Sequence, residues 1–373
     1  MKSKNYLSYL IIFLISLTAQ IPLTSMRYVV PYLAHSYGAS IFIIGLLGTI
    51  YGLIYFILAS IFGKLSDKFG IKKMASIGMI LYILVIISYK FYDRPYEFLI
   101  GRAFEAVSMS MVWPAVESLS SKLGGKSKEE ALLMYTFGWS VGASIAPYAV
   151  AYLLSYNYIY PLIFSSIISL ISALLIISSK QGIEIEINKY EGNFSILFNI
   201  FLPMLLYGFD SSIFYSFYSV YGPVFGFNKE DTGLLGTLYG ILQTLAFILS
   251  WLFAKKISSN KLIIGGTIMS VPLFILYFDH SYIFNSILFS ILGLGMGFVY
   301  YATLINIFRT FHRDLTSKTG IFESSIGIGY VIGPLIAGIP TKLGYIFPWI
   351  ILAIFSFIIL IIEVYGYIEG KTI

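Results

Sequence analysis

An octet of residues occurs twice in this chain, almost unchanged, half a chain length apart. Residues 45–52 read GLLGTIYG and residues 233–240 read GLLGTLYG, so one position in eight differs within the 373-residue sequence. Around each octet, residues 41–62 and 232–254 are apolar, and about 20 apolar residues are what a helix needs to cross a bilayer. The repeat therefore predicts a duplicated set of membrane spans, which is typical of transporters whose halves move against each other.

Composition places the chain in a membrane and excludes several classes of function. It is 58% hydrophobic and 11% charged, whereas soluble domains are about 25% charged. The net charge of +6 comes from short lysine clusters between apolar runs, which indicates orientation in a membrane rather than nucleic-acid binding. The absence of cysteine excludes disulfides and thiol chemistry. The sequence shows no metal-spaced cluster and no nucleophile–base set, so we expect no metal, no cofactor and no enzyme activity.

Apolar runs divide the chain into twelve predicted helical spans, which makes it an all-α integral membrane protein. Six spans per half give both halves the same orientation, so the repeat is related by an axis along the membrane normal. We expect an N-terminal six-helix bundle at 1–178, a cytoplasmic linker at 179–194 and a C-terminal six-helix bundle at 195–373. The spans are 7–31, 41–62, 74–90, 97–121, 129–154, 158–178, 195–221, 232–254, 262–278, 282–308, 317–340 and 345–366.

The distribution of basic residues predicts the topology. With the N-terminus in the cytoplasm, 18 of the 24 Lys and Arg residues fall on the inner side and four on the outer side. Arg27 and Arg102 lie within spans. Positive charge accumulates on cytoplasmic loops, so we predict a multi-pass protein of the cell membrane with both termini in the cytoplasm.

The segment between the second and third spans carries a distinctive pattern. Residues 63–73 read GKLSDKFGIKK. The two glycines allow a tight turn between helices, and an aspartate can accept hydrogen bonds at a helix N-terminus, where the dipole favours an anion. The spacing resembles the signature loop of the major facilitator superfamily. The matching residues are Gly63, Asp67, Lys68, Gly70, Lys72 and Lys73.

This resemblance extends over nearly the whole chain and implies two six-helix bundles that rock around a central cavity. Arg102 resembles the family's fourth-helix arginine, and Glu105 lies three residues on, on the same helix face. The fifth and eleventh spans each place a glycine five residues before a proline, at Pro147 and Pro334. Ala146 and Ala151 stand where the antiporter version of this motif usually has glycine, so the type of transport stays open.

Small residues recur four positions apart in four of the spans, and such pairs let helix backbones approach closely in membranes. The resemblance implies that the second and eleventh helices, and the fifth and eighth, meet between the halves. The glycine pairs would make these helix surfaces smooth and let the halves slide against each other during transport. The alternative is that the pairs serve static packing only. The pairs are Gly48 and Gly52, Gly138 and Gly142, Gly236 and Gly240, and Gly329 and Gly333.

Charged residues inside the spans are costly in lipid and usually functional. We predict Asp210, near the middle of the seventh span, as the residue that couples transport to an ion, with Arg27 as a possible partner. A structural aspartate that bonds to neighbouring hydroxyls is the alternative. Glu117 and Glu363 lie near cytoplasmic ends, where we expect them to snorkel. The coupling or substrate candidates are Asp210, Arg27, Arg102, Glu105 and Glu323.

Aromatic residues dominate the predicted interior, and aromatic walls suit amphipathic or aromatic solutes. We therefore favour proton-coupled efflux of such compounds by a monomeric secondary transporter, with a small-molecule substrate, a proton or other coupling ion, and the lipid bilayer as partners. Uptake of a small nutrient or metabolite is the alternative, and an integral-membrane enzyme or receptor a remote one. The candidate cavity aromatics are Trp113, Trp139, Tyr207, Tyr215, Tyr218, Tyr300 and Tyr301.

Overall fold

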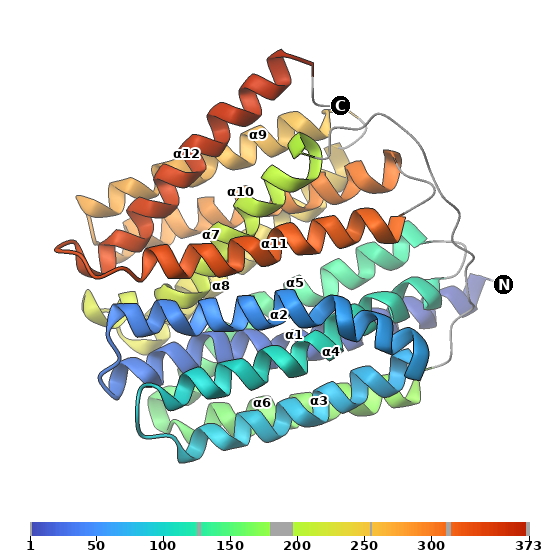
Figure 1. Cartoon of the computed structure of the whole chain (residues 1–373), viewed down its shortest axis with the longest axis horizontal. Coiled ribbons are helices and arrows are strands. Elements are labelled where there is room, and N and C mark those ends of the chain that lie inside the picture. The colour runs from blue at the N-terminus through green and yellow to red at the C-terminus, as the bar shows by residue number, and fades with distance from the viewer. Residues whose placement is uncertain (1, 125–127, 180–196, 254–255, 311–314, 371–373) are drawn as a thin grey trace.

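A computed structural model describes residues 2–124, 128–179, 197–253, 256–310 and 315–370. Within these ranges the chain forms twelve α-helices and no strand (Figure 1). The helices are α1 (Lys2–Ser36), α2 (Ile41–Phe69), α3 (Ile71–Ser88), α4 (Glu97–Gly124), α5 (Lys128–Tyr156), α6 (Ile159–Ser178), α7 (Leu202–Val224), α8 (Lys229–Phe253), α9 (Ser259–Ser270), α10 (Tyr282–Thr310), α11 (Leu315–Ala337) and α12 (Phe347–Ile368).

Each predicted span coincides with one of these helices, so the all-α, twelve-helix prediction is confirmed. Ten helices of the described chain are long and apolar enough to cross a membrane. The predicted ninth span combines α9 with a 3₁₀ turn at Val271–Tyr277, which begins where Pro272 removes a helical hydrogen-bond donor. Large apolar side chains on outer helices are exposed, among them Leu84, Leu174 and Phe357, as expected for surfaces that face lipid.

The helices of each half pack mainly among themselves. In the first half α1 packs against α5 and α6, and α3 against α4 and α6. In the second half α7 packs against α11 and α12, and α9 against α10 and α12. Figure 1 shows the two sets as separate groups of ribbons. The predicted linker, 179–194, lies almost wholly outside the described residues, so its boundaries stay a prediction.

The repeated octets lie between the halves. The first octet, on α2, faces α11: a Cβ added at Gly45 would come within 2.4 Å of the Pro334 carbonyl oxygen. The second octet, on α8, faces α5: a Cβ added at Gly233 would come within 2.8 Å of the Pro147 carbonyl oxygen. Only glycine permits backbones to approach this closely, which is why the same octet is present at both contacts.

The glycine pairs of α5 and α11 have a different position from the one expected. A Cβ at Gly138 would meet the Phe13 carbonyl oxygen of α1 at 2.5 Å. A Cβ at Gly329 would meet the Phe209 backbone nitrogen of α7 at 2.4 Å. These glycines therefore close contacts within one half, while the glycines of α2 and α8 close contacts between halves.

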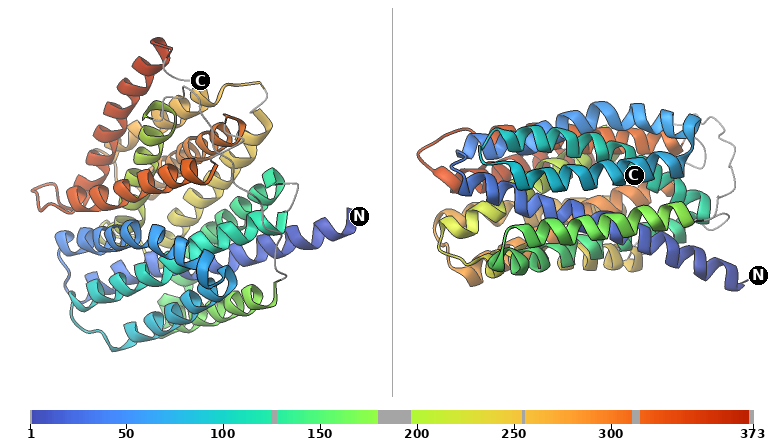
Figure 2. Two further views of the ribbon diagram at one scale, coloured as in Figure 1. Left: turned by 45° about the vertical axis from the view of Figure 1, so that its right-hand side comes forward. Right: turned by 90° about the horizontal axis from the view of Figure 1, so that it is seen from below.

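Several contacts between the halves lie at the end of the bundle opposite the termini. The Tyr28 hydroxyl of α1 donates to the Lys229 carbonyl of α8 at 2.8 Å, and the Lys229 ammonium donates to the Leu154 carbonyl of α5 at 3.2 Å. In the left view of Figure 2, α2 and α11 lie close together at this end and separate toward the end that carries the N-terminus. The halves are thus joined most tightly at the end opposite the termini.

Candidate functional site in the centre of the bundle

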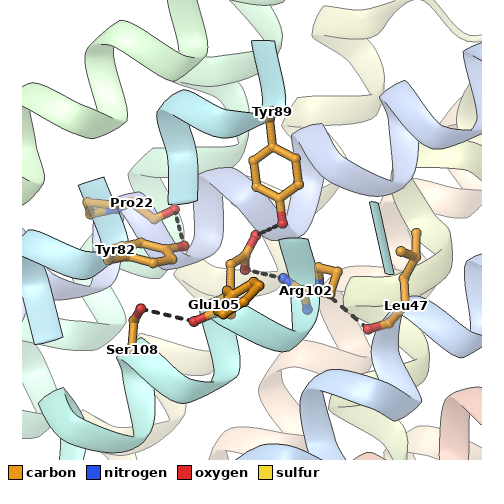
Figure 3. Close-up of polar contacts among 8 residues, drawn as sticks. Pro22, Leu47, Tyr82, Tyr89, Arg102, Glu105 and Ser108 are labelled. Atoms are coloured by element: carbon orange, nitrogen blue, oxygen red, sulfur yellow. Dashed lines mark hydrogen bonds and ion pairs between the residues drawn. The ribbon is translucent and has the colours of Figure 1, made fainter. Parts of the chain in front are cut away.

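A buried ion pair on α4 borders the contact between the halves (Figure 3). Arg102 donates from Nη1 to Glu105 Oε2 at 2.5 Å, and from Nε to the Leu47 carbonyl of α2 at 3.4 Å. Tyr89 donates to the other Glu105 oxygen. Glu105 is 0% exposed, so the pair satisfies a charge that would otherwise be very costly to bury.

Arg27 of α1 has no such partner. Its guanidinium carbon lies 5.0 Å from the Tyr215 ring centre, 5.6 Å from Tyr330 and 5.9 Å from Tyr51, within the range of cation–π attraction. No carboxylate or other acceptor among the described residues forms an ion pair or hydrogen bond with it. Glu105 interacts with it only at longer range, because that carboxylate pairs directly with Arg102. The cluster of the two arginines and Glu105 therefore carries one net positive charge.

These groups surround a small cavity between the halves, which we call the arginine site. Its volume is about 20 Å³, room for one or two water molecules and not for an organic solute. Residues from α1, α2, α4, α7 and α11 form its wall, so both halves contribute. They are Arg27, Pro31, Leu47, Gly48, Tyr51, Arg102, Ser212, Tyr215, Ser216 and Tyr330. A solute can enter only if the halves move apart.

The structure brings most of the predicted cavity aromatics together beside the arginine site. Trp139 of α5 lies 5.5 Å from Tyr300 of α10 and 5.4 Å from Phe247 of α8, measured between ring centres. Tyr207 of α7 lies 4.9 Å from Tyr300, and Tyr301 packs on Phe247 at 5.6 Å. This aromatic cluster joins the two halves. Tyr215 belongs to the arginine site instead.

Two predicted aromatics lie elsewhere. Trp113 contacts Tyr135 of α5 at 6.3 Å between ring centres, and both belong to the first half. Tyr218 is 0% exposed and stacks on Phe214 of its own helix at 4.7 Å. It also meets Tyr28 of α1 at 5.5 Å. Tyr218 therefore packs between α1 and α7 and does not line the arginine site.

Glu323 of α11 lies across the halves from Glu117 of α4. The two carboxylates interact electrostatically, and both interact with Tyr300 of the aromatic cluster. Both side chains are half-buried. Glu117 thus interacts with Glu323 across the halves, and its expected snorkelling stays a prediction.

Asp210 and Arg27 are not brought together. Asp210 is 0% exposed and accepts a hydrogen bond from Ser356 of α12 at 3.0 Å. It thus faces the outer helices of its own half, away from the arginine site. Glu363 is 3% exposed and accepts a hydrogen bond from Thr267 of α9 at 2.8 Å. The expectation that Glu363 reaches the membrane surface is wrong, because it belongs to the buried face of α12.

The signature loop is mostly helical. The helix α2 continues through Phe69, and the chain turns at Gly70 alone, which has φ 101°. The expectation that Gly63 takes part in the turn is wrong: it lies inside α2, where a Cβ would meet only Pro114 of α4, at 3.8 Å. Lys72 donates to the Ser179 carbonyl at the end of α6, and Lys68 and Lys73 are exposed. The Asp67 side chain lies outside the described residues.

The protein has two six-helix halves with a charged cavity between them, and the cavity opens when the halves separate. This arrangement defines a class of membrane transport proteins. A sequence model of the Major Facilitator Superfamily matches residues 9–191 and 200–369. The chain belongs to this superfamily, and it is therefore a multi-pass secondary transporter and not an enzyme.

Solved structures of transporters share this fold. The nucleoside transporter NupG superimposes with a TM-score of 0.75 at 12% identity, covering 96% of this chain and 99% of that one. A bacterial homologue of the human lysosomal transporter Spinster, inward-facing and unoccupied, gives a TM-score of 0.74 at 13% identity, covering 100% and 98%. No curated protein sequence matches the chain. At such low identity the similarity establishes the fold alone.

Sequence reasoning missed six of the ten residues that line the arginine site, which are Pro31, Leu47, Tyr51, Ser212, Ser216 and Tyr330. Tyr51 belongs to the first octet, and Tyr330 directly follows Gly329. Both lie one position from residues that the glycine pattern singled out. Their position beside glycines that close helix contacts was the available signal, since the Cβ that Gly52 lacks would meet Tyr330 across the halves.

Proposed function

We propose that this chain exports organic anions with an aromatic or apolar body, and that the arginine site binds their negatively charged group. The observation that carries the proposal is Arg27, an arginine inside the membrane without a carboxylate partner among the described residues. Its three tyrosine neighbours orient the guanidinium without neutralising it. A carboxylate or similar anion supplies the missing charge through charge-assisted hydrogen bonds, and the neighbouring aromatic cluster accommodates the apolar body.

Export suits an anion on physical grounds. The inside-negative potential of a cell membrane drives an anion outward with about 2.3 kcal/mol per charge per 100 mV. Exchange for an inward-moving proton adds a second driving force in the same direction. Uptake of the same anion needs a proton to overcome the potential, so uptake is the costlier direction.

Transport proceeds by alternating access. The arginine site is too small for a solute as it stands, and it is bounded by α2 and α11, which meet at glycines. Separation of the halves at either end admits solute to Arg27, and the tight contacts opposite the termini represent one closed gate. The signature loop at the end of α2 is the proposed latch at the other end, held by Asp67.

A binding panel tests the substrate class. Purified protein is heated with benzoate or indole-3-acetate and, in parallel, with the neutral analogues benzamide and indole-3-acetamide. Binding to the native state raises the melting temperature by mass action. We expect stabilisation by at least one anion, none by its amide, and loss of the effect in Arg27→Gln. Arg94→Gln, at a side chain that is 69% exposed, is the matched control. Equal shifts from anion and amide would refute the proposed class.

A second candidate rests on Glu117 and Glu323. Two acids that interact across the halves beside the aromatic cluster suit an amphipathic cation. Tetraphenylphosphonium belongs in the same panel for this reason. Stabilisation by this cation that depends on Glu323, with no effect of the anions, would replace the first proposal by the second.

A further inference from the structure

Two buried carboxylates in the second half face away from the arginine site. Asp210 of α7 is 0% exposed and its Oδ1 has no hydrogen-bond partner among the described residues. Glu363 of α12 is 3% exposed and its Oε1 likewise has none. No Lys, Arg or His of the described chain pairs with either acid. The groups that face them are the hydroxyls of Ser270, Ser356 and Thr267.

Both acids meet a hydroxyl that already has another acceptor. Ser356 Oγ lies 3.0 Å from Asp210 Oδ2 and 2.8 Å from the Leu352 carbonyl. Thr267 Oγ1 lies 2.8 Å from Glu363 Oε2 and 3.0 Å from the Ile263 carbonyl. A hydroxyl has one proton to donate. When that proton bonds to the carbonyl of its own helix, a protonated acid can donate to the hydroxyl in turn, which an ionised acid cannot do.

The hydroxyl of Ser270, on α9, is a further polar group beside Asp210. It is 0% exposed, Asp210 lies within its electrostatic reach, and it has no other partner among the described residues. A protonated Asp210 has a donor to offer it. An ionised acid in this site would remain a bare charge in a low-dielectric interior, which is far costlier than a neutral one.

The two acids are connected along the helices. Ser356 and Glu363 are seven residues apart on α12, two turns or roughly 10 Å along one face. Thr267 and Ser270 are three apart on α9 and therefore share a face. The polar groups thus form a track between α9 and α12, from Glu363 near the end that carries the termini to Asp210 deeper in the bundle.

The first half lacks this track. By the repeat offset of 188 residues, Asp210 corresponds to Pro22 and Ser270 to Tyr82. There the Tyr82 hydroxyl donates to the Pro22 carbonyl at 3.3 Å (Figure 3), so a phenol fills the space and bonds the neighbouring helix directly. The first half therefore packs this region without a buried acid, whereas the second half has two buried acids here, Asp210 and Glu363.

We propose that α7, α9 and α12 form a proton-binding site separate from the arginine site, with Asp210 as the deep acid and Glu363 as the group through which protons reach it. This inference rests on the proposed function, since an exporter coupled to protons must bind them somewhere. It places the proton and the substrate in different compartments of the molecule.

Infrared spectroscopy of the purified full-length protein tests the site without any substrate, so its outcome is independent of the anion proposal. At neutral pH we expect the C=O stretching band of protonated carboxylic acid, which shifts in D₂O. Asp210→Asn should remove one component and Glu363→Gln another, while Asp279→Asn, at an exposed loop acid, should leave the band unchanged. Absence of the band in the native protein would overturn the proposal.

The order of the two acids is tested by exchange kinetics. If protons pass through Glu363, Glu363→Gln should keep the Asp210 band but slow its shift in D₂O by roughly 100-fold, the lower end of what a positioned proton-transfer group contributes. An unchanged rate would remove Glu363 from the pathway. If sodium chloride abolishes the band, or stabilises the native protein but not Asp210→Asn, the site binds sodium and the proton assignment fails.

Discussion

The two halves share one backbone plan and differ in how they hold charge. In the first half Glu105 pairs with Arg102 at the contact between the halves, and Arg27 stands unpaired beside it. In the second half Asp210 and Glu363 lie in the bundle interior, each with one oxygen unpartnered among the described residues. On this shared plan, one half has a cationic site that faces the other half, and the other half has an acidic site that faces its own helices. We infer a division of roles between substrate binding and proton binding.

The largest expected effect compares the two buried acids directly. Glu105→Gln leaves Arg102 buried without its counter-charge, and breaking a buried pair costs about 3–5 kcal/mol. Asp210→Asn replaces a neutral acid with a neutral amide of the same shape and should lower stability far less. The melting temperatures of both variants, measured side by side, show which substitution lowers stability more. If Asp210→Asn destabilises as much as Glu105→Gln does, Asp210 is ionised and the contrast between the halves disappears.

A matched pair of glycine substitutions separates contacts between halves from contacts within one. Gly329→Ala introduces a Cβ 2.4 Å from the Phe209 nitrogen, inside the second half, and overpacking of this kind costs about 1–3 kcal/mol of stability. Gly45→Ala introduces a Cβ 2.4 Å from the Pro334 oxygen, where the halves can relieve the clash by separating. We expect Gly329→Ala to lower the melting temperature and Gly45→Ala to change the conformation instead.

Spin labels report that change. The chain has no cysteine, so Asp93→Cys and Lys342→Cys, both exposed and in loops at the end opposite the termini, can be labelled without background. Gly45→Ala should lengthen the distance between these labels. An unchanged distance together with a lower melting temperature would mean that the α2–α11 contact is static packing.

The proposed latch should show a smaller effect. Asp67 lies in the last turn of α2, so the latch requires it to meet the N-terminus of a neighbouring helix. Such a contact contributes about 0.3–2 kcal/mol, enough to bias a nearly balanced equilibrium between two conformations. Asp67→Asn should therefore leave the protein folded and separate the halves at the end that carries the termini. Labels at Lys73→Cys and Lys261→Cys measure this separation. A distance distribution identical to that of the unmutated Asp67 protein would exclude a latch at this residue.

The smallest expected effect is that of cutting the chain between the halves. If the bundles are independent units joined by a tether at 179–194, co-expressed fragments 1–186 and 187–373 should assemble and transport nearly as well as the intact chain. Fragments that insert but do not pair would assign a structural role to the linker.

The sequence predicted the contacts that depend on helix spacing along one chain segment. The octet glycines lie between the halves, at the α2–α11 and α5–α8 contacts that the family resemblance implied. Arg102 and Glu105 pair because three residues bring side chains to one helix face. Glu363 could also have been recognised as buried, since it continues the buried stripe of Leu352, Ser356 and Ile359 on α12.

The pairing of Asp210 with Arg27 could have been doubted from the repeat itself. Position 210 of α7 corresponds to position 22 of α1, five residues before Arg27. Five residues rotate by about 140° around a helix beyond one full turn, so equivalent helices cannot turn both side chains to the centre. Packing across the whole bundle determines which face of a helix meets which neighbour. This orientation cannot be derived from a local sequence pattern.

Transport by the reconstituted protein tests the division of roles most directly. Proteoliposomes are loaded with the panel anion that binds most tightly, and its release is followed under an imposed potential and, separately, under a pH gradient. We predict that Arg27→Gln abolishes release under both, while Asp210→Asn retains anion exchange but loses the response to the pH gradient. Release from Asp210→Asn vesicles that follows the pH gradient as in the unmutated protein would contradict the account.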